Sequence, residues 1–207
     1  MKNILKTNAL KGVLLVGMLF ASAAFCEVSY GSLTDTRDGK SYKTVRIGTQ
    51  TWMAENLNYK TDESYCYEDN PGSCRKYGRL YTWATARNAC PVGWHLPSRA
   101  EWMTLEEFVA NSLFGGKMDS VGYALKSTSG WEYFGGKLSN GSDAFGFGAL
   151  PAAYRFGERR FVLGAAYFWS TSKYVAYFRY LYYDDTFLGT SDDIEDRAMS
   201  VRCVKDS

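Results

Sequence analysis

The fold of this chain is decided by one stretch of sequence, Cys90-Pro91-Val92-Gly93-Trp94-His95-Leu96-Pro97-Ser98-Arg99-Ala100-Glu101-Trp102. Pro91 ends any helix that precedes it, because proline lacks a backbone N–H and clashes with the preceding turn. Ser98 and Glu101 have the spacing of a capping box, in which each side chain hydrogen-bonds the backbone N–H of the other residue. These signals predict one helix over Leu80–Ala89 and a second, amphipathic helix from Ser98 to about Leu113.

Four of the five cysteines lie beyond the N-terminal segment, and in an exported chain they predict two disulfides, for which three pairings exist. Cys66 and Cys74 flank Asn70-Pro71-Gly72, which predicts a turn, so a local bond between these two cysteines is easy to close. That bond leaves Cys90 to pair with Cys203. The alternative interpretation is a metal site, but the spacings lack the C-x₂-C pairs that zinc sites favour.

Residues 1–26 have the features of a secretory signal peptide. Lys2, Lys6 and Lys11 precede an apolar run, Gly12–Ala24, which is shorter than the roughly 20 residues of a transmembrane helix. We therefore expect an exported protein that is secreted, periplasmic or on the cell surface, with no transmembrane helix in the mature chain. The alternative is a lipid anchor on Cys26, although Phe25 stands where a lipobox has a small residue.

Charge and length limit the partners and the number of domains. Loss of residues 1–26 removes three lysines and no acidic residue from 24 basic and 22 acidic side chains, so the mature chain is close to neutral. Nothing in this balance indicates nucleic acid or an anionic membrane as a partner. We expect a flexible lead-in over residues 27–34, one domain over residues 35–207, and a monomer.

The rest of the chain favours antiparallel strands. Ser41–Ile47 alternates polar and apolar side chains, and with Thr51–Ala54 it predicts a hairpin across Gly48-Thr49-Gln50. Strands concentrate in the second half, where no linker or internal repeat interrupts them, so the predicted class is α+β with antiparallel sheets. The four strand-like stretches there are Phe147–Phe156, Arg160–Ser170, Ala176–Tyr183 and Ala198–Val204.

Aromatic and arginine side chains alternate along these later strands. Aromatic faces with guanidinium groups suit sugars or extended peptides, by stacking and by bidentate hydrogen bonds. The alternative is that one side of each strand simply faces the core. The candidate ligand-binding residues are Tyr154, Arg155, Trp169, Arg179 and Tyr182.

Carboxylates gather between residues 184 and 196. The candidate cation ligands are Asp184, Asp185, Asp192 and Asp193, and the alternative is a solvated loop. Such carboxylates would also serve a glycosidase, if two of them lay about 5–10 Å apart in a cleft. His95 is the only histidine, and no nucleophile elbow, Walker loop or zinc motif is present. We therefore expect no catalytic residue, and no cofactor unless calcium binds at the aspartates.

Several motifs together resemble the Fibrobacter succinogenes major paralogous domain family, over nearly all of residues 35–207. The matching segments are Asp38–Gly48, Gln50–Tyr59, Tyr77–Trp83, Cys90–Ser98, Glu101-Trp102, Gly146-Phe147, Ala149–Ala152, Phe168–Thr171 and Ser200–Val204.

The resemblance places the chain in the C-type-lectin-like group, which also contains the formylglycine-generating enzymes. It implies two helices, antiparallel sheets, paired N- and C-terminal strands, a long loop region, and a disulfide from a helix to the last strand, which supports Cys90–Cys203. Trp169-Ser170-Thr171 stands where sugar-binding lectins carry a calcium motif, and no spare cysteine pair matches the oxidase relatives. The family brings no established activity.

These observations predict an exported, disulfide-bonded, non-catalytic binding module for a polysaccharide or another cell-surface partner. The alternatives are a structural surface protein without a small ligand and a carbohydrate-active enzyme.

Overall fold

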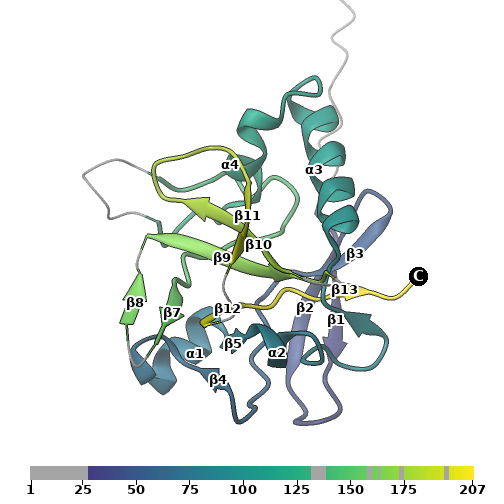
Figure 1. Cartoon of the computed structure of the whole chain (residues 1–207). Coiled ribbons are helices and arrows are strands. Elements are labelled where there is room, and N and C mark those ends of the chain that lie inside the picture. The colour runs from purple at the N-terminus through teal and green to yellow at the C-terminus, as the bar shows by residue number, and fades with distance from the viewer. Residues whose placement is uncertain (1–27, 132–138, 158–159, 163, 173–174, 194–195) are drawn as a thin grey trace, which may run out of the picture.

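The structure, a computed structural model, describes residues 28–131, 139–157, 160–162, 164–172, 175–193 and 196–207. Within these residues the chain has the predicted α+β fold, with two β-sheets and four α-helices (Figure 1). The predicted signal peptide and Cys26 lie outside the described residues. In the ranges described, no helix combines the length and the apolar character that a membrane span requires.

The smaller sheet joins the N-terminal hairpin to the end of the chain. Its strand order is β1-β2-β3-β13-β6, and its neighbouring strands are antiparallel. Val204 in β13 pairs with Trp52 on one side and His95 on the other. The C-terminal strand therefore pairs with β3 of the N-terminal hairpin, while β1 lies at the edge of the sheet. The strands are β1 Tyr30–Thr34, β2 Ser41–Ile47, β3 Gln50–Met53, β6 Trp94–His95 and β13 Val204–Lys205.

The larger sheet has the strand order β11-β10-β9-β12-β5-β4, with β7 joined to β12 and β8 joined to β7. β10 is antiparallel to both β9 and β11, so these three strands form a meander at one edge. The strands are β4 Ser64–Tyr65, β5 Leu80–Thr82, β7 Tyr154–Phe156, β8 Arg160–Val162, β9 Ala165–Ser170, β10 Ala176–Tyr182, β11 Gly189–Asp193 and β12 Arg197–Ser200.

The longest helix begins at the predicted capping box. Ser98 accepts a hydrogen bond from the backbone N–H of Glu101, and the Glu101 carboxylate accepts one from the N–H of Ser98. Trp102 and Leu105 on this helix are fully buried. The helices are α1 Pro71–Tyr77, α2 Trp83–Ala86, α3 Arg99–Leu113 and α4 Val121–Leu125, with 3₁₀ turns η1 Tyr67–Asp69 and η2 Met118–Ser120.

Two local predictions in the first half were wrong. The predicted helix Leu80–Ala89 begins instead as strand β5, and only Trp83–Ala86 is α-helical. Pairing of β5 with β4 and β12 outweighs the helix propensity of its residues. Asn70-Pro71-Gly72 is the start of α1 rather than an isolated turn, because Asn70 caps the helix and proline suits its first position.

Strand boundaries also differ from the prediction. Residues 30–34 of the expected lead-in form β1, which pairs with β2. Most of Phe147–Phe156 is not strand, and only its last three residues form β7. The stretch Arg160–Ser170 is divided into β8 and β9. The stretch Ala198–Val204 is divided between the two sheets, and the chain crosses from one to the other at Val201-Arg202-Cys203.

Both predicted disulfides form, Cys66–Cys74 and Cys90–Cys203. The larger sheet separates two apolar clusters, because both sides of β9 are buried. Ala166 and Phe168 face the cluster that contains Trp102 of α3, whereas Tyr167 and Trp169 face the other cluster. The meander is thereby held rigidly from both sides near β9.

Candidate functional site

One face of the β9–β10–β11 meander carries aromatic rings that are only partly covered. Side chains alternate along β10, so Phe178, Tyr180 and Tyr182 lie on the face opposite Arg179 and Leu181. Phe178 is buried, Tyr180 is half-buried, and 40 % of Tyr182 is exposed. The rings on this side of β10 therefore lead from the core to the surface.

Neighbouring strands extend the row of rings. Tyr167 of β9 is the register partner of Tyr180, and its ring centroid lies 6.1 Å from Tyr182 and 4.8 Å from Tyr154 of β7. The Tyr180 ring lies 4.9 Å from Tyr182 and 6.1 Å from Phe187, which follows β10 in the turn. Separations of about 4.5–7 Å are those of packed aromatic pairs. These five rings thus form one continuous row of contacts, although Tyr167 itself is buried.

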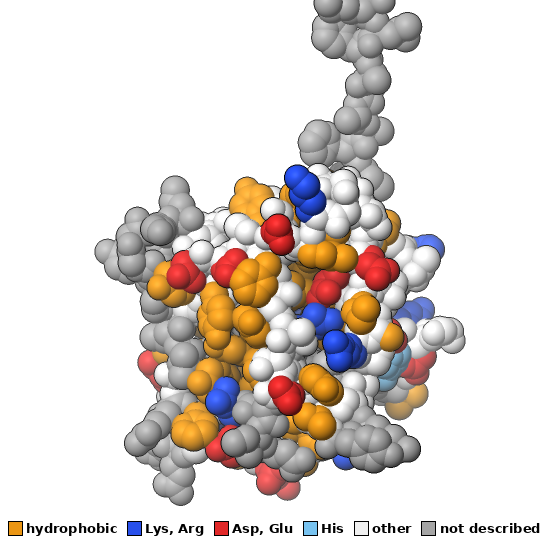
Figure 2. Space-filling view, turned by 45° about the horizontal axis from the view of Figure 1, so that its top comes forward, with side chains coloured by type: hydrophobic (Ala, Val, Ile, Leu, Met, Phe, Trp, Pro, Cys, Tyr) orange, Lys and Arg blue, Asp and Glu red, His pale blue; other side chains and the backbone are white. Residues whose placement is uncertain are grey.

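A cation and two exposed rings complete this surface. The Arg197 guanidinium lies 4.8 Å from the Tyr154 ring and 5.9 Å from the Phe156 ring, which is 38 % exposed. Phe187 is 36 % exposed. In the space-filling view, hydrophobic side chains gather on the left, the side on which Figure 1 places β7, β8 and β9 (Figure 2). The aromatic face consists of Tyr154, Phe156, Tyr167, Tyr180, Tyr182 and Phe187.

A glycine on β11 allows the Tyr180 ring to lie flat against the sheet. Gly189 is the register partner of Tyr180, and a Cβ atom at Gly189 would lie 2.1 Å from Cζ of the Tyr180 ring. Any other residue would therefore displace the ring. The position of Tyr180 in the aromatic face depends on this glycine.

The hydroxyl group of Tyr167 remains protonated. Burial raises the pKa of Tyr167 far above its ordinary value, and a hydrogen bond with the side chain of Tyr182 raises the pKa further. A neutral phenol both donates and accepts hydrogen bonds. The face therefore combines apolar rings with hydrogen-bonding phenol groups. A sugar likewise combines apolar C–H surfaces with hydroxyl groups.

A buried lysine holds the turn that carries the outer part of the face. Lys126 is only 2 % exposed, and its Nζ donates to the carbonyl oxygens of Tyr182, Tyr183 (3.4 Å) and Asp185 (2.5 Å). Burial lowers the pKa of Lys126 to about 8, against the opposing effect of Asp185 and Asp184. The ammonium group thus holds the backbone of residues 182–185, where the chain leaves β10 and turns towards β11.

Only part of the predicted ligand-binding set lies together. Tyr154 and Tyr182 belong to the aromatic face. Trp169 is 0 % exposed and its Nε1–H donates to the Tyr81 carbonyl at 2.7 Å, so it is a core residue. Arg179 is buried on the opposite side of β10, where it forms an ion pair with Glu106 at 2.5 Å. Arg155 points away from Tyr154 and lies 3.7 Å from the centroid of the Tyr65 ring.

The candidate cation ligands do not form one cluster. Asp184 and Asp185 lie in the turn that follows β10, whereas Asp192 and Asp193 pair with Tyr177 and Ala176 at the other end of the hairpin. At about 3.4 Å per strand residue, the two pairs are separated by the length of the hairpin. Among the described side chains, no three of His, Cys, Asp and Glu converge in a way that could hold a metal ion. The strand register therefore places Asp184 and Asp185 at one end of the hairpin, and Asp192 and Asp193 at the other.

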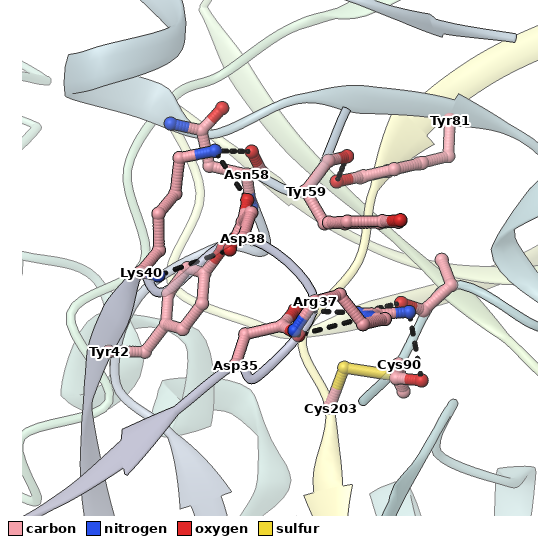
Figure 3. A network of polar contacts seen from close by, with 11 residues as sticks. Asp35, Arg37, Asp38, Lys40, Tyr42, Asn58, Tyr59, Tyr81, Cys90 and Cys203 are labelled. Carbon is pink, nitrogen blue, oxygen red and sulfur yellow. Dashed lines mark hydrogen bonds and ion pairs between the residues drawn. A yellow bond between two sulfur atoms is a disulfide. The ribbon is translucent and has the colours of Figure 1, made fainter. Parts of the chain in front are cut away.

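A separate polar network joins the β1–β2 turn to the Cys90 corner (Figure 3). Asp35, which is fully buried, accepts hydrogen bonds from Nε and Nη2 of Arg37 at 2.8 and 2.6 Å, and Nη2 also donates to the Ala89 carbonyl at 2.8 Å. Burial raises the pKa of Asp35, but the hydrogen bonds and charge of Arg37 outweigh this effect and hold it below its ordinary value. The network is structural, because it ties the N-terminal hairpin to the disulfide Cys90–Cys203.

Sequence reasoning did not identify several residues that shape the face. Phe156 and Phe187 give no periodic signal in short segments, and the contribution of Gly189 depends on a strand register that the sequence does not reveal. Lys126 directly follows α4, and nothing in its local sequence indicates that it is buried. Tyr154 and Tyr182 were found because alternation along a strand is visible without the register.

Comparison with known protein families matches residues 45–205 to the Fibrobacter succinogenes major domain (Fib_succ_major). The match spans more than three quarters of the chain and includes both disulfides and the aromatic face. No curated protein and no solved structure gives a significant match.

Proposed function

The chain belongs to the Fibrobacter succinogenes major domain family, and we propose that it is an exported, non-catalytic module whose aromatic face binds a polysaccharide. The two disulfides fit a protein that folds in an oxidising compartment outside the cytoplasm. The observation that carries the proposal is the continuity of the face: five of its rings form an unbroken series of contacts, and Phe156 is joined to Tyr154 through Arg197. Three of the six rings are between 36 % and 40 % exposed.

The chemistry of the face suits a sugar chain. Sugar rings present apolar C–H surfaces that pack on aromatic rings, while their hydroxyl groups need donors and acceptors nearby. Tyr182 and Tyr180 supply exposed ring surface together with phenolic hydroxyls. Arg197 adds a planar guanidinium beside Tyr154, which can bind neighbouring oxygens in pairs. A surface that extends over several strands favours a polymer over a single small molecule.

We propose a binding role without catalysis or calcium. A glycosidase needs two carboxyls about 5–10 Å apart. The pair Asp184 and Asp185 and the pair Asp192 and Asp193 lie at opposite ends of the β10–β11 hairpin, which supports a role without catalysis by the two pairs together. The aromatic face consists of Tyr and Phe residues and contains no carboxylate that could hold a divalent cation, so binding there would not depend on one. Polysaccharide binding should therefore persist in a chelator.

The proposal is tested by affinity electrophoresis and insoluble-polysaccharide pull-down of the exported chain, with and without calcium and chelator. Cellulose, xylan and mannan serve as probes, together with a glycan array. Tyr182→Ala and Phe156→Ala should each weaken binding about tenfold, which corresponds to about 1.4 kcal/mol.

Tyr30→Ala is the matched control, because Tyr30 is a tyrosine that is 49 % exposed on β1 in the other sheet. It should bind like the wild type. Equal binding by all three variants would show that the face is not the site. A wild-type chain that binds no polysaccharide would favour a structural surface protein instead.

A further inference from the structure

A cleft lies away from the aromatic face. It has a volume of about 260 Å³ and lies between the start of β2, the segment that follows β3, and the end of α1. Its volume is below the roughly 300–1,000 Å³ of pockets for drug-sized ligands, so it suits one small polar unit. The charged side chains that line it are Lys40, Glu55, Arg75, Lys76 and Arg202.

A glycine shapes the wall of this cleft. Gly78 ends α1 with φ of 74°, and a Cβ atom there would lie 2.7 Å from Cβ of Asn56 and 2.9 Å from its carbonyl oxygen. The next residue, Arg79, donates its N–H to the Leu57 carbonyl at 2.9 Å. The end of α1 therefore lies directly against the Asn56–Leu57 backbone, and Arg75 and Lys76 are fixed at the rim.

The charge around the cleft is predominantly positive. Four of its lining residues are cations and one is a carboxylate. Arg75 and Lys76 are exposed, and within the described part of the chain neither forms an ion pair. The third rim cation, Lys40, donates from Nζ to Asp38 at 2.7 Å and to the Asn58 carbonyl at 2.9 Å, which holds it beside Asn58 (Figure 3).

The fourth cation is buried behind the cleft wall. Arg202 is 1 % exposed, and the hydrogen-bond partners found for it among the described residues are neutral oxygens. Its Nη2 and Nε donate to Oδ1 of Asn56 at 2.7 and 3.0 Å, and its Nη1 donates to the Phe147 carbonyl. Burial lowers the pKa of Arg202 to about 9, and nearby Asp143 and Glu55 oppose this effect. A buried charge with neutral partners adds a positive field at the floor of the cleft.

We propose that this cleft is a second binding site, which takes an anionic sugar unit of a polysaccharide through its carboxylate or sulfate group. Arg75 and Lys76 pair with the anionic group, while Asn58 and Ser41 line the cleft with hydrogen-bonding groups for the sugar hydroxyls. The site does not rely on the aromatic face. If the cleft does not bind an anionic sugar, the proposed function of the aromatic face is unaffected. If the aromatic face does not bind polysaccharide, the proposal for the cleft is likewise unaffected.

The test uses the exported chain and three soluble polymers: polygalacturonate as the carboxylate probe, dextran sulfate as the sulfate probe, and dextran as the neutral control. Binding is measured by calorimetry at low and at moderate salt. The double variant Arg75→Gln/Lys76→Gln should bind the anionic polymer about fivefold or more weakly, as expected for the loss of two partly exposed ion pairs. The stronger of the two anionic probes identifies the group that the cleft prefers.

Lys117→Gln/Lys205→Gln is the matched control, because it removes the same charge from exposed positions outside the cleft. It should bind like the wild type. The proposal is overturned if neither anionic polymer binds, if the Arg75/Lys76 variant binds as tightly as the wild type, or if the control loses as much affinity as that variant.

Discussion

The Nε2 atom of His95 lies 2.7 Å from Oε1 of Glu101, and the Nδ1 atom of the same ring lies 2.6 Å from Oδ1 of Asp206. The other Glu101 oxygen accepts hydrogen bonds from the backbone N–H and the hydroxyl of Ser98, both at 2.7 Å. One imidazole therefore connects the capping box of α3 to the segment that follows β13. Burial lowers the pKa of His95, but the hydrogen bonds and charges of Asp206 and Glu101 outweigh it, so the pKa lies above its ordinary value.

The first prediction concerns pH. Because the folded-state pKa of His95 is raised, its stabilising contribution is complete below the unfolded pKa of about 6.5 and is lost as pH rises through the folded value. The contribution is below about 1 kcal/mol, because the pair is partly exposed to solvent. Urea unfolding from pH 5 to pH 9 should show this loss in the wild type and not in His95→Gln. Identical slopes in the two proteins would contradict it.

The second prediction concerns the disulfides. Cys90–Cys203 closes a loop with a sequence separation of 113, and Cys66–Cys74 one with a separation of 8. Replacing both cysteines of the long loop by alanine should lower the free energy of unfolding by about 4–5 kcal/mol, against about 2–3 kcal/mol for the short loop. Guanidinium unfolding of the two double variants measures the difference. A larger loss from the Cys66/Cys74 variant would show that chain entropy does not dominate.

The third prediction concerns Gly189. In Gly189→Ala the new Cβ must displace the Tyr180 ring, so polysaccharide binding should fall about tenfold, comparable with about 1.4 kcal/mol, while the fold persists. Near-ultraviolet circular dichroism should report the change in tyrosine packing. The control is Thr190→Ala at the next, exposed position of β11. Unchanged binding by the glycine variant would remove Tyr180 from the proposed face.

The fourth prediction concerns Lys126. Lys126→Met removes the donor for three carbonyl oxygens and should lower the free energy of unfolding by about 1–3 kcal/mol at pH 7, whereas Lys117→Met at an exposed position should change it by less than about 0.5 kcal/mol.

The same lysine gives a second measurement. The unfolded chain keeps its Lys126 proton to about pH 10.4, whereas the folded chain releases it near pH 8, so the contribution of this group to stability rises with pH between those values. The Lys126→Met variant should lack that rise. A pH slope that survives the substitution would assign it to another group.

The sequence was sufficient where the determining contacts are local. Ser98 and Glu101 are three residues apart and form the capping box as predicted, and the short spacing of Cys66 and Cys74 already indicated their bond. The helix predicted over Leu80–Thr82 was wrong because these residues form a strand that pairs with residues 198–200 of β12. No local pattern reveals a contact with so distant a segment.

The candidate site shows the same division. Alternation along Ala176–Tyr183 made Tyr182 a candidate, but it could not show which side of the strand is open to solvent. The sequence pattern assigned Trp169 and Arg179 to the surface, but both are buried. β9 and the first part of β10 are covered on both sides by clusters assembled from distant segments, which the pattern could not show. Burial on both faces removes the contrast on which a sequence pattern relies.

The position of β13 has a consequence for how this protein reaches its native state. Until Val204 inserts, Trp52 in β3 and His95 in β6 each lie on a strand whose edge is open. Open edges recruit strands from other chains, so the reduced and incompletely folded molecule should self-associate. The disulfide Cys90–Cys203 keeps the closing strand beside both edges, so its formation should protect the protein from aggregation as well as stabilise it.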